Sequence, residues 1–333
     1  MNNKIKLLDC TLRDGGFVND WQFGNESAND IVSRATRAGM DYVEVGFLRN
    51  EPNVEGRLVF NTMESAAATI KKTDAKRCIM LELSGKYPLD KIPERTCDSI
   101  EMIRVMIWKT LLHEGLYYCK ALIDKGYEVG VQAIRSDDYT EDEFKHFIDT
   151  YNTINPTAVY VVDSFGVMCK EQVLSYAAIA DEYLNDRILL GYHAHNNMQQ
   201  AYINAVSFLE KEWKHELMLD ASVLGMGRGA GNLNTELLLH YLNTHGAQYD
   251  LKPIVEIANR HIQKYLGDVD WGYSMPYFLS AINGRNSRFV KYLQSKNVDL
   301  ETMYKVFSMM KNEATGIRYD EALCDEYIHK VAL

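Results

Sequence analysis

Two widely separated segments of the chain carry residues that can bind a divalent metal ion. Arg13 and Asp14 follow an apolar run that begins at residue 5, and a later apolar run ends in His193 and His195. Side chains two residues apart on an extended strand point to the same side, so both imidazoles can reach one ion while Asp14 supplies an oxygen. Mixed nitrogen and oxygen ligands suit Mn²⁺, Mg²⁺, Zn²⁺, Co²⁺ or Fe²⁺. The alternative, hydrogen-bonded histidines without metal, is the more common role of an isolated H-x-H, but Asp14 and the strand-end position favour a metal site.

Composition excludes several other classes of function. The chain has 333 residues and a formal net charge of −10, which argues against a nucleic-acid partner because phosphate binding needs basic patches. The six cysteines are scattered without a C-x-x-C pair, a pattern typical of a reduced, cytoplasmic protein. Apolar runs are short and interrupted by charge, so we expect no membrane-spanning helix.

Eight short apolar runs alternate with longer amphipathic stretches over the first three quarters of the chain. Buried parallel strands have this near-continuous apolar character, and their number and alternation predict an α/β fold, a TIM (β/α)8 barrel. The predicted strands are 5–10, 42–46, 78–83, 100–107, 128–134, 158–162, 188–193 and 217–224. The predicted helices are 26–38, 58–70, 111–125, 141–151, 172–184, 198–209 and 233–245.

The pattern changes near Pro253 to helix and loop segments without a convincing strand. We therefore divide the chain into a catalytic barrel, residues 1–250, and a mostly helical C-terminal extension, residues 251–333. An aromatic-rich stretch at 271–280 lies within this extension.

Functional groups of such barrels lie at the carboxyl ends of the strands, and several polar residues occupy those positions. Arg13 could hold a substrate carboxylate or stabilise an enolate oxygen, or it could be a structural ion-pair residue. Glu44 could relay protons at the barrel mouth or pair with Arg13. We assign contacts with substrate to three further strand-end residues: Lys109, for which a solvated lysine is an equal alternative, Ser164 and Ser222.

A glycine-rich loop follows the last predicted strand, from Gly225 to Asn232. Dinucleotide binding would require this pattern after the first strand of a βαβ unit, so that function is not expected. We expect a flexible loop that closes the barrel mouth, with Asn232 near the start of the next helix.

Together these motifs resemble the DRE-TIM metallolyase superfamily, the HMGL-like group. It includes 4-hydroxy-2-oxovalerate aldolase, hydroxymethylglutaryl-CoA lyase and the isopropylmalate, homocitrate and citramalate synthases. The matching segments are D-x-T-L-R-D-G from Asp9, V-E-V-G from Val43, D-S-x-G from Asp163, H-x-H-N from His193, and G-x-G from Gly225 to the Gly231-Asn232 pair.

The resemblance implies that Asp14, His193 and His195 bind a divalent cation, Mn²⁺ or Mg²⁺ first among them, with Asn232 as a further ligand. It implies that Arg13 steadies a carbonyl that becomes an enolate. The C-terminal extension is similar in size to that of the hydroxyoxovalerate aldolases, which bring a tyrosine to the active site. Tyr277 is our candidate for that role, with Tyr273 as the other choice and aromatic packing as the alternative for both.

Three departures bear on the substrate. Where these aldolases carry a histidine base, and the synthases and lyases a glutamine, this chain has Phe17. The loop before Asn232 contains Met226 and Arg228 but not the cysteine of the hydroxymethylglutaryl-CoA lyases. The 101 residues that follow Asn232 leave no room for the long regulatory domain of the isopropylmalate synthases, which we therefore do not expect.

The leading hypothesis is a divalent-metal-dependent aldolase that cleaves or forms a 4-hydroxy-2-oxo acid through a pyruvate enolate. One alternative is a Claisen-type acyltransferase that condenses acetyl-CoA with a 2-oxo acid, and another is a catalytically impaired metal-binding module. We expect a small 2-oxo acid as substrate and a homodimer paired through the C-terminal helices. An acylating aldehyde dehydrogenase is a further partner by analogy alone.

Overall fold

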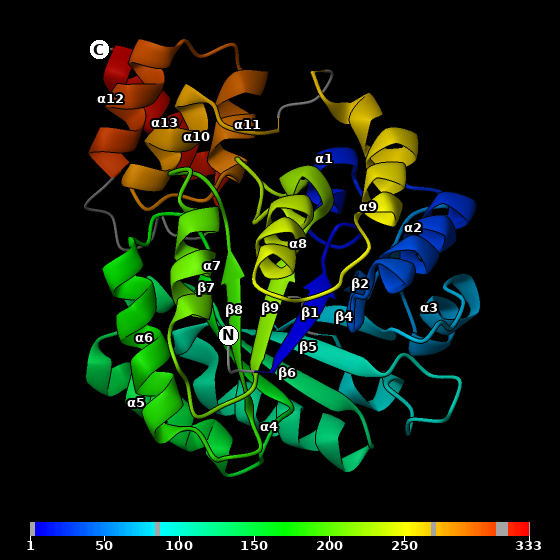
Figure 1. The fold of residues 1–333 in the computed structure, drawn as a ribbon. Coiled ribbons are helices and arrows are strands. Elements are labelled where there is room, and N and C mark those ends of the chain that lie inside the picture. Colours follow the sequence, from blue (N-terminus) through cyan, green and yellow to red (C-terminus); the bar gives the residue numbers. More distant parts are fainter. Residues whose placement is uncertain (1–3, 84–86, 268–270, 311–318, 333) are drawn as a thin grey trace.

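Eight parallel strands close into a barrel (Figure 1) in the computed structural model, which describes residues 4–83, 87–267, 271–310 and 319–332. Neighbouring strands follow chain order, and β1 closes the barrel by pairing with both β2 and β9. The barrel strands are β1 (Ile5–Asp9), β2 (Tyr42–Leu48), β4 (Lys76–Glu82), β5 (Met102–Ile107), β6 (Glu128–Ala133), β7 (Ala158–Asp163), β8 (Leu189–Ala194) and β9 (Leu217–Ala221). The prediction of a TIM barrel is confirmed.

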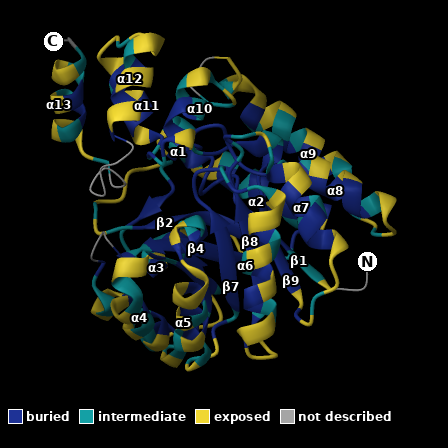
Figure 2. Cartoon of the chain, turned by 90° about the vertical axis from the view of Figure 1, so that its left-hand side faces the viewer, coloured by how far each residue is buried: buried dark blue, intermediate teal, exposed yellow. Residues whose placement is uncertain are grey.

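Helices surround the barrel and leave their polar faces outward, so that buried strands lie inside a partly exposed shell (Figure 2). They are α2 (Asn25–Ala38), α3 (Met63–Thr69), α4 (Leu112–Asp124), α5 (Glu141–Asn152), α6 (Lys170–Tyr183), α7 (Ala201–Glu210) and α8 (Thr235–Thr244), with the short α1 (Gly16–Asn19) before them. No helix in the described ranges is both long and apolar enough to span a membrane.

One predicted helix begins later than its apolar pattern suggested. We expected helix over 58–70, but β3 (Val59–Phe60) instead pairs with the end of β2. The helix starts only after Thr62, whose hydroxyl accepts from the backbone N–H of Ser65 while the Ser65 hydroxyl accepts from that of Thr62. This capping box fixes the helix start, and a periodic pattern of apolar residues does not show it.

The C-terminal region is helical, as predicted, and contains two parts. α9 (Leu251–Ile257) packs along α2 and contributes to the core of the barrel. α10 (Met275–Ile282), α11 (Arg288–Ser295), α12 (Leu300–Met310) and α13 (Glu321–Ala332) enclose a second hydrophobic core and lie beyond the carboxyl ends of the strands (Figure 1). The division at residue 250 stays a prediction.

Glycines inside the barrel make room for a large aromatic side chain. Tyr160 is buried inside the barrel, and its ring lies over the guanidinium of Arg104, with 4.7 Å between Cζ and the ring centroid. Gly191 is its neighbour on β8, where a Cβ would overlap the Tyr160 ring. At Gly130, on the other side, a Cβ would lie 3.1 Å from the flexible end of Met102.

We therefore expect Gly191→Ala to lower the free energy of unfolding by about 2 kcal/mol, because the added methyl overpacks the barrel interior. The matched control, Gly130→Ala, should change it by less than about 1 kcal/mol, because the Met102 side chain can move. Urea unfolding followed by circular dichroism measures both. Equal losses for the two variants would contradict this explanation of the Tyr160 position.

Candidate metal centre and active site

The turn after β1 is held by its own side chains. The carboxylate of Asp9 accepts from the backbone N–H and the hydroxyl of Thr11 at 3.1 and 2.9 Å. The Thr11 hydroxyl also accepts from the backbone N–H of Val223, after β9. Complete burial raises the pKa of Asp9 to about 7. These contacts fix the backbone that presents Arg13 and Asp14 at the barrel mouth.

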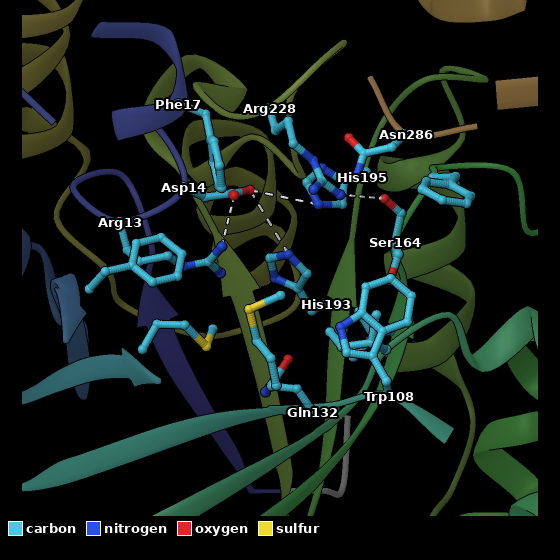
Figure 3. Close-up of a pocket in the computed structure, with 16 residues that line it drawn as sticks. Arg13, Asp14, Phe17, Trp108, Gln132, Ser164, His193, His195, Arg228 and Asn286 are labelled. Atoms are coloured by element: carbon cyan, nitrogen blue, oxygen red, sulfur yellow. Dashed lines mark hydrogen bonds and ion pairs between the residues drawn. The ribbon is translucent and has the colours of Figure 1, made fainter. Parts of the chain in front are cut away.

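Asp14, His193 and His195 converge in the structure as the sequence predicted (Figure 3). The Asp14 Oδ2 atom lies 4.0 Å from His193 Nε2 and 3.8 Å from His195 Nε2. All three side chains are buried, and Oδ2 has no hydrogen-bond partner in the part of the chain that the structure describes. An unpartnered buried carboxylate oxygen is costly, and a cation between it and the two imidazole nitrogens removes that cost. The residues therefore fit a divalent ion.

Each imidazole is oriented by its other ring nitrogen. His193 Nδ1 lies 2.8 Å from Asp220 Oδ2, and His195 Nδ1 lies 3.3 Å from the carbonyl oxygen of Gly231. With the protons on Nδ1, both Nε2 lone pairs face Asp14, the arrangement common among metal-binding histidines. Burial lowers the pKa of His195 to about 3, so this ring is neutral near pH 7.

Asn232, predicted as a further ligand, lies directly behind this group. Its backbone bridges to that of His195, and its Oδ1 atom is buried without a hydrogen-bond partner from any described residue. Its amide nitrogen lies 3.5 Å from the Ser222 hydroxyl and 3.4 Å from the carbonyl oxygen of Met226. A ligand role for Asn232 stays a prediction, and Ser222 lies behind Asn232 rather than at the pocket wall.

Buried ion pairs connect Asp14 to His193 through the barrel interior. Arg13 donates to Asp14 Oδ1 at 2.7 Å and to Glu44 Oε2 at 2.6 Å. Arg104 pairs with Glu44 at 2.8 Å and also with Asp220, which holds His193. Burial opposes both charges in the first pair, but the partners outweigh it, so the pKa of Asp14 is lowered and the pKa of Arg13 is raised.

Arg104 and Asp220 were missed in the sequence analysis. Each is one charged residue inside an otherwise apolar strand, Met102–Ile107 and Leu217–Ala221 respectively. A charge in such a run was the available signal, because a fully buried charged group needs a partner. The sequence alone does not show that β5 and β9 point these two side chains toward each other.

A pocket of about 550 Å³ opens onto the candidate metal site. One part of its wall is polar: Arg13, Asp14, Gln132, Ser164, His193, His195, Arg228 and Asn286. The rest is apolar: Phe17, Phe47, Met80, Met106, Trp108, Ile134, Val162 and Phe165. The Gly225–Asn232 loop lies at the barrel mouth, and its Arg228 side chain reaches toward His195 (Figure 3).

Besides Asn232 and Ser222, three predicted site residues lie outside the pocket wall. Glu44 is behind Arg13, fully buried between the two arginines. Lys109 begins a short turn after β5 and pairs with Glu143 at 2.9 Å, while the preceding Trp108 lines the pocket instead. Tyr277 is fully buried in the C-terminal core, where its carbonyl oxygen accepts from Asn197. Their roles in catalysis or substrate binding stay predictions.

Phe17 lies in an aromatic cluster at the pocket wall. Its ring makes edge contacts with Trp21 and Phe47, at centroid distances of 4.8 and 5.9 Å. Among the described residues that line this pocket, the ionisable side chains are Asp14, the two histidines and two arginines. No carboxylate or imidazole beyond the proposed ligands is therefore present at this wall to act as a base.

Removing one imidazole should weaken metal binding strongly without unfolding the chain. We expect His193→Ala to weaken Mn²⁺ binding about 100-fold or more, because Asp14 and His195 alone leave the ion short of a ligand. Asp220 keeps its pairing with Arg104, so the melting temperature of the metal-free protein should change little. Isothermal titration calorimetry measures the affinity.

The matched control is His215→Ala, which removes another buried histidine whose Nδ1 lies near the carbonyl oxygen of Ile188. This variant should bind Mn²⁺ as the wild type does. Unchanged binding in His193→Ala would contradict the assigned site.

Asp220 should tune the metal site without contacting the ion. We expect Asp220→Asn to weaken Mn²⁺ binding about 10- to 100-fold, because the neutral amide no longer raises the basicity of His193. The same titration measures this effect, with Asp181→Asn as the control. Asp181 accepts backbone N–H groups of Lys214 and His215. Equal affinity in wild type and Asp220→Asn would show that Asp220 serves only the fold.

Comparisons with known proteins agree with this geometry. Residues 98–260 match the HMGL-like family model. A 4-hydroxy-2-oxovalerate aldolase of Bacillus cereus is 24% identical over 250 residues, which cover 74% of this chain and 72% of the relative. An oxaloacetate decarboxylase of Mycobacterium tuberculosis is 25% identical over 298 residues, which cover 87% and 85% of the two chains.

Solved structures show the same fold. The N-terminal domain of a putative aldolase from Bacteroides vulgatus superposes with a TM-score of 0.71 and is 28% identical, over 87% of this chain and 96% of that one. An HMG-CoA lyase of Bacillus subtilis superposes with a TM-score of 0.60 at 15% identity, over 79% and 94%. The chain therefore contains an HMGL-like domain, as the resemblance to the DRE-TIM metallolyases predicted, and its enzyme class is that of a metal-dependent carbon–carbon lyase.

Proposed function

We propose that this chain is a divalent-metal-dependent aldolase that cleaves or forms a 4-hydroxy-2-oxo acid by way of a pyruvate enolate. The observation that supports this most directly is the convergence of Asp14, His193 and His195 beside Arg13 in one pocket. Relatives named as 4-hydroxy-2-oxovalerate aldolases support the same reaction class. Mn²⁺ and Mg²⁺ are the ions that we propose.

Arg13 supplies a fixed positive charge for this chemistry. Asp14 and Glu44 hold its guanidinium from two directions, and its side chain lines the pocket. A bound divalent ion would polarise the 2-oxo group and lower the free-energy cost of enolate charge. A preorganised guanidinium next to that oxygen stabilises the same charge without reorganising during the reaction.

The apolar part of the pocket suits the body of the substrate. Met80, Met106 and Trp108 line it opposite the charged end. A small 2-oxo acid bound there would displace water from the region around Arg13. Charge interactions strengthen where water is excluded, which favours enolate formation further.

The described residues of the pocket wall around Phe17 include no general base, and this favours a second candidate reaction. Aldol cleavage requires a base to take the proton of the 4-hydroxyl group, and the described pocket residues offer none beyond the proposed ligands. Loss of CO₂ from a 2-oxo dicarboxylate gives the same enolate without such a base. Decarboxylation of oxaloacetate is therefore the second candidate, and one relative carries that name.

Other expectations stay proposals. They are the homodimer, the aldehyde dehydrogenase partner and the cytoplasmic location. Condensation with acetyl-CoA and a catalytically impaired metal-binding role remain the alternatives to a pyruvate-releasing lyase.

Pyruvate release distinguishes these reactions. We expect the protein with Mn²⁺ or Mg²⁺ to release pyruvate from 4-hydroxy-2-oxovalerate, from oxaloacetate or from both, and to lose this activity with a chelator. Lactate dehydrogenase coupled to NADH oxidation measures the product. Because free metal ions also decarboxylate oxaloacetate, rates are compared with metal alone and with His193→Ala.

If the metal-loaded wild type released no pyruvate above these controls, the proposed function would be wrong. Thiol release from acetyl-CoA in the presence of a 2-oxo acid would then identify a Claisen-type acyltransferase. If the protein bound metal but formed neither pyruvate nor free thiol, the catalytically impaired metal-binding module would be supported.

A further inference from the structure

Arg228 is a cation at the pocket wall whose guanidinium has no carboxylate partner among the described residues. It donates to the carbonyl oxygen of Ser164 at 3.3 Å and lies over the Phe17 ring, with 5.6 Å between Cζ and the ring centroid. Within the described ranges no Asp or Glu oxygen lies within 4 Å of its nitrogens, whereas Arg13 and Arg104 each pair with two carboxylates. A guanidinium has five N–H donors, so most of this group remains available to a ligand.

A small polar space adjoins Arg228 and His195. Ser164, Phe165, His195, Asn197, Arg228, Arg285 and Ser287 line it. Arg285 is 2% exposed and donates to the carbonyl oxygen of Met310. In Figure 3, Arg228 and Asn286 extend toward the same side of His195. Two guanidinium groups and two hydroxyl groups thus border one enclosed space beside the candidate metal site.

The loop that carries Arg228 is tied down at several points. The backbone N–H of Ala230 donates to the Asn197 side chain at 3.3 Å, and that of Gly272 donates to the carbonyl oxygen of Gly229. Gly229 and Gly231 have φ angles of +67° and +89°, which side chains rarely allow. In this conformation the contacts position Arg228 at the pocket wall, and a preorganised donor binds its ligand at a lower entropic cost; the flexibility of the loop stays a prediction.

We propose that Arg228 and Arg285 form an anion subsite that takes a second anionic group of the substrate, a carboxylate or a phosphoryl group. The proposal rests on the proposed function: the 2-oxo acid end lies at Asp14, His193 and His195, and the far end lies between the two guanidinium groups. A guanidinium fork matches both kinds of anion, and a bound anion supplies the counter-charge that the described residues do not give Arg228.

The outer approach to this subsite is also basic. Arg228 lines a wider cleft of about 830 Å³ with Arg288 and Lys291, in which Asp20 is the acidic residue. Lys291 also donates to the carbonyl oxygen of Phe17 at 2.9 Å, which ties α11 to the barrel mouth. A cleft with an excess of positive charge attracts anionic substrates toward the pocket. The positive charge of this cleft agrees with a substrate that carries two negative groups.

Binding of a matched pair of probes tests this subsite separately from turnover. We compare 2-oxoglutarate with 2-oxopentanoate, which has a methyl group in place of the second carboxylate, by isothermal titration calorimetry on Mg²⁺-loaded protein. Wild type should bind the dicarboxylate about tenfold more tightly or better, because the second carboxylate accepts charge-assisted hydrogen bonds that a methyl group cannot. In Arg228→Gln this ratio should fall toward one, and Arg228→Lys should keep part of it.

Arg187→Gln is the control for loss of one positive charge, because Arg187 is exposed and precedes the amino end of β8, at the opposite end of the barrel. It should keep the wild-type ratio. A third probe, 3-phosphonopyruvate, distinguishes the two ligand classes: tighter binding than 2-oxoglutarate, lost in Arg228→Gln, assigns the subsite to phosphoryl groups. Weaker binding assigns it to carboxylates.

Two results would count against the inference. If wild type bound 2-oxoglutarate and 2-oxopentanoate equally, or if Arg228→Gln kept the wild-type ratio, the anion subsite would be wrong while the 2-oxo acid function stood. If wild type bound none of the 2-oxo acids and released no pyruvate, the proposed function would fail, and the subsite with it.

Discussion

Buried charge pairing inside the barrel is the interaction on which the rest of the site depends. Arg13 and Arg104 alternate with the carboxylates of Asp14, Glu44 and Asp220 in one connected chain that ends at His193. Removing charges from water is costly, and the cost is recovered only where the partners are close and well aligned. Loss of any one member would leave at least one other charge buried with one partner fewer.

The net charge of these ion pairs agrees with the charges of the proposed metal ion and substrate. Two guanidinium groups face three carboxylates, so the chain of ion pairs carries one excess negative charge beside the unpartnered oxygen of Asp14. A divalent cation reverses the sign of the site. With Arg228 added at the pocket wall, the local charge then suits a substrate with two negative groups, in agreement with the anion subsite.

Much of the architecture was predictable because buried parallel strands leave a strong local signal. Their apolar runs gave all eight barrel strands, and the strand-end rule placed Asp14, His193 and His195 together. The capped start of α3 depended on hydrogen bonds of Thr62 and Ser65 that an apolar pattern does not contain. At the end of β5 the prediction differs from the structure by one residue, because Trp108 faces the pocket and the predicted Lys109 turns away.

Long-range pairing was the part that the sequence could not supply. Arg104 and Asp220 are 116 positions apart, and only closure of the barrel places them in contact. The C-terminal helices likewise bring Arg285 and Ser287 beside His195, although nothing in their local sequence indicates a site. Tyr277 was assigned to the site from a resemblance in the extension, whereas its side chain packs into the second core.

The most direct test of the metal centre is electron spin echo envelope modulation of protein-bound Mn²⁺. The structure predicts nitrogen couplings from two imidazoles, of which His193→Ala removes one set while the residual signal comes from His195. Bound Mn²⁺ without any imidazole nitrogen coupling would contradict the assignment of Asp14, His193 and His195 as the metal site.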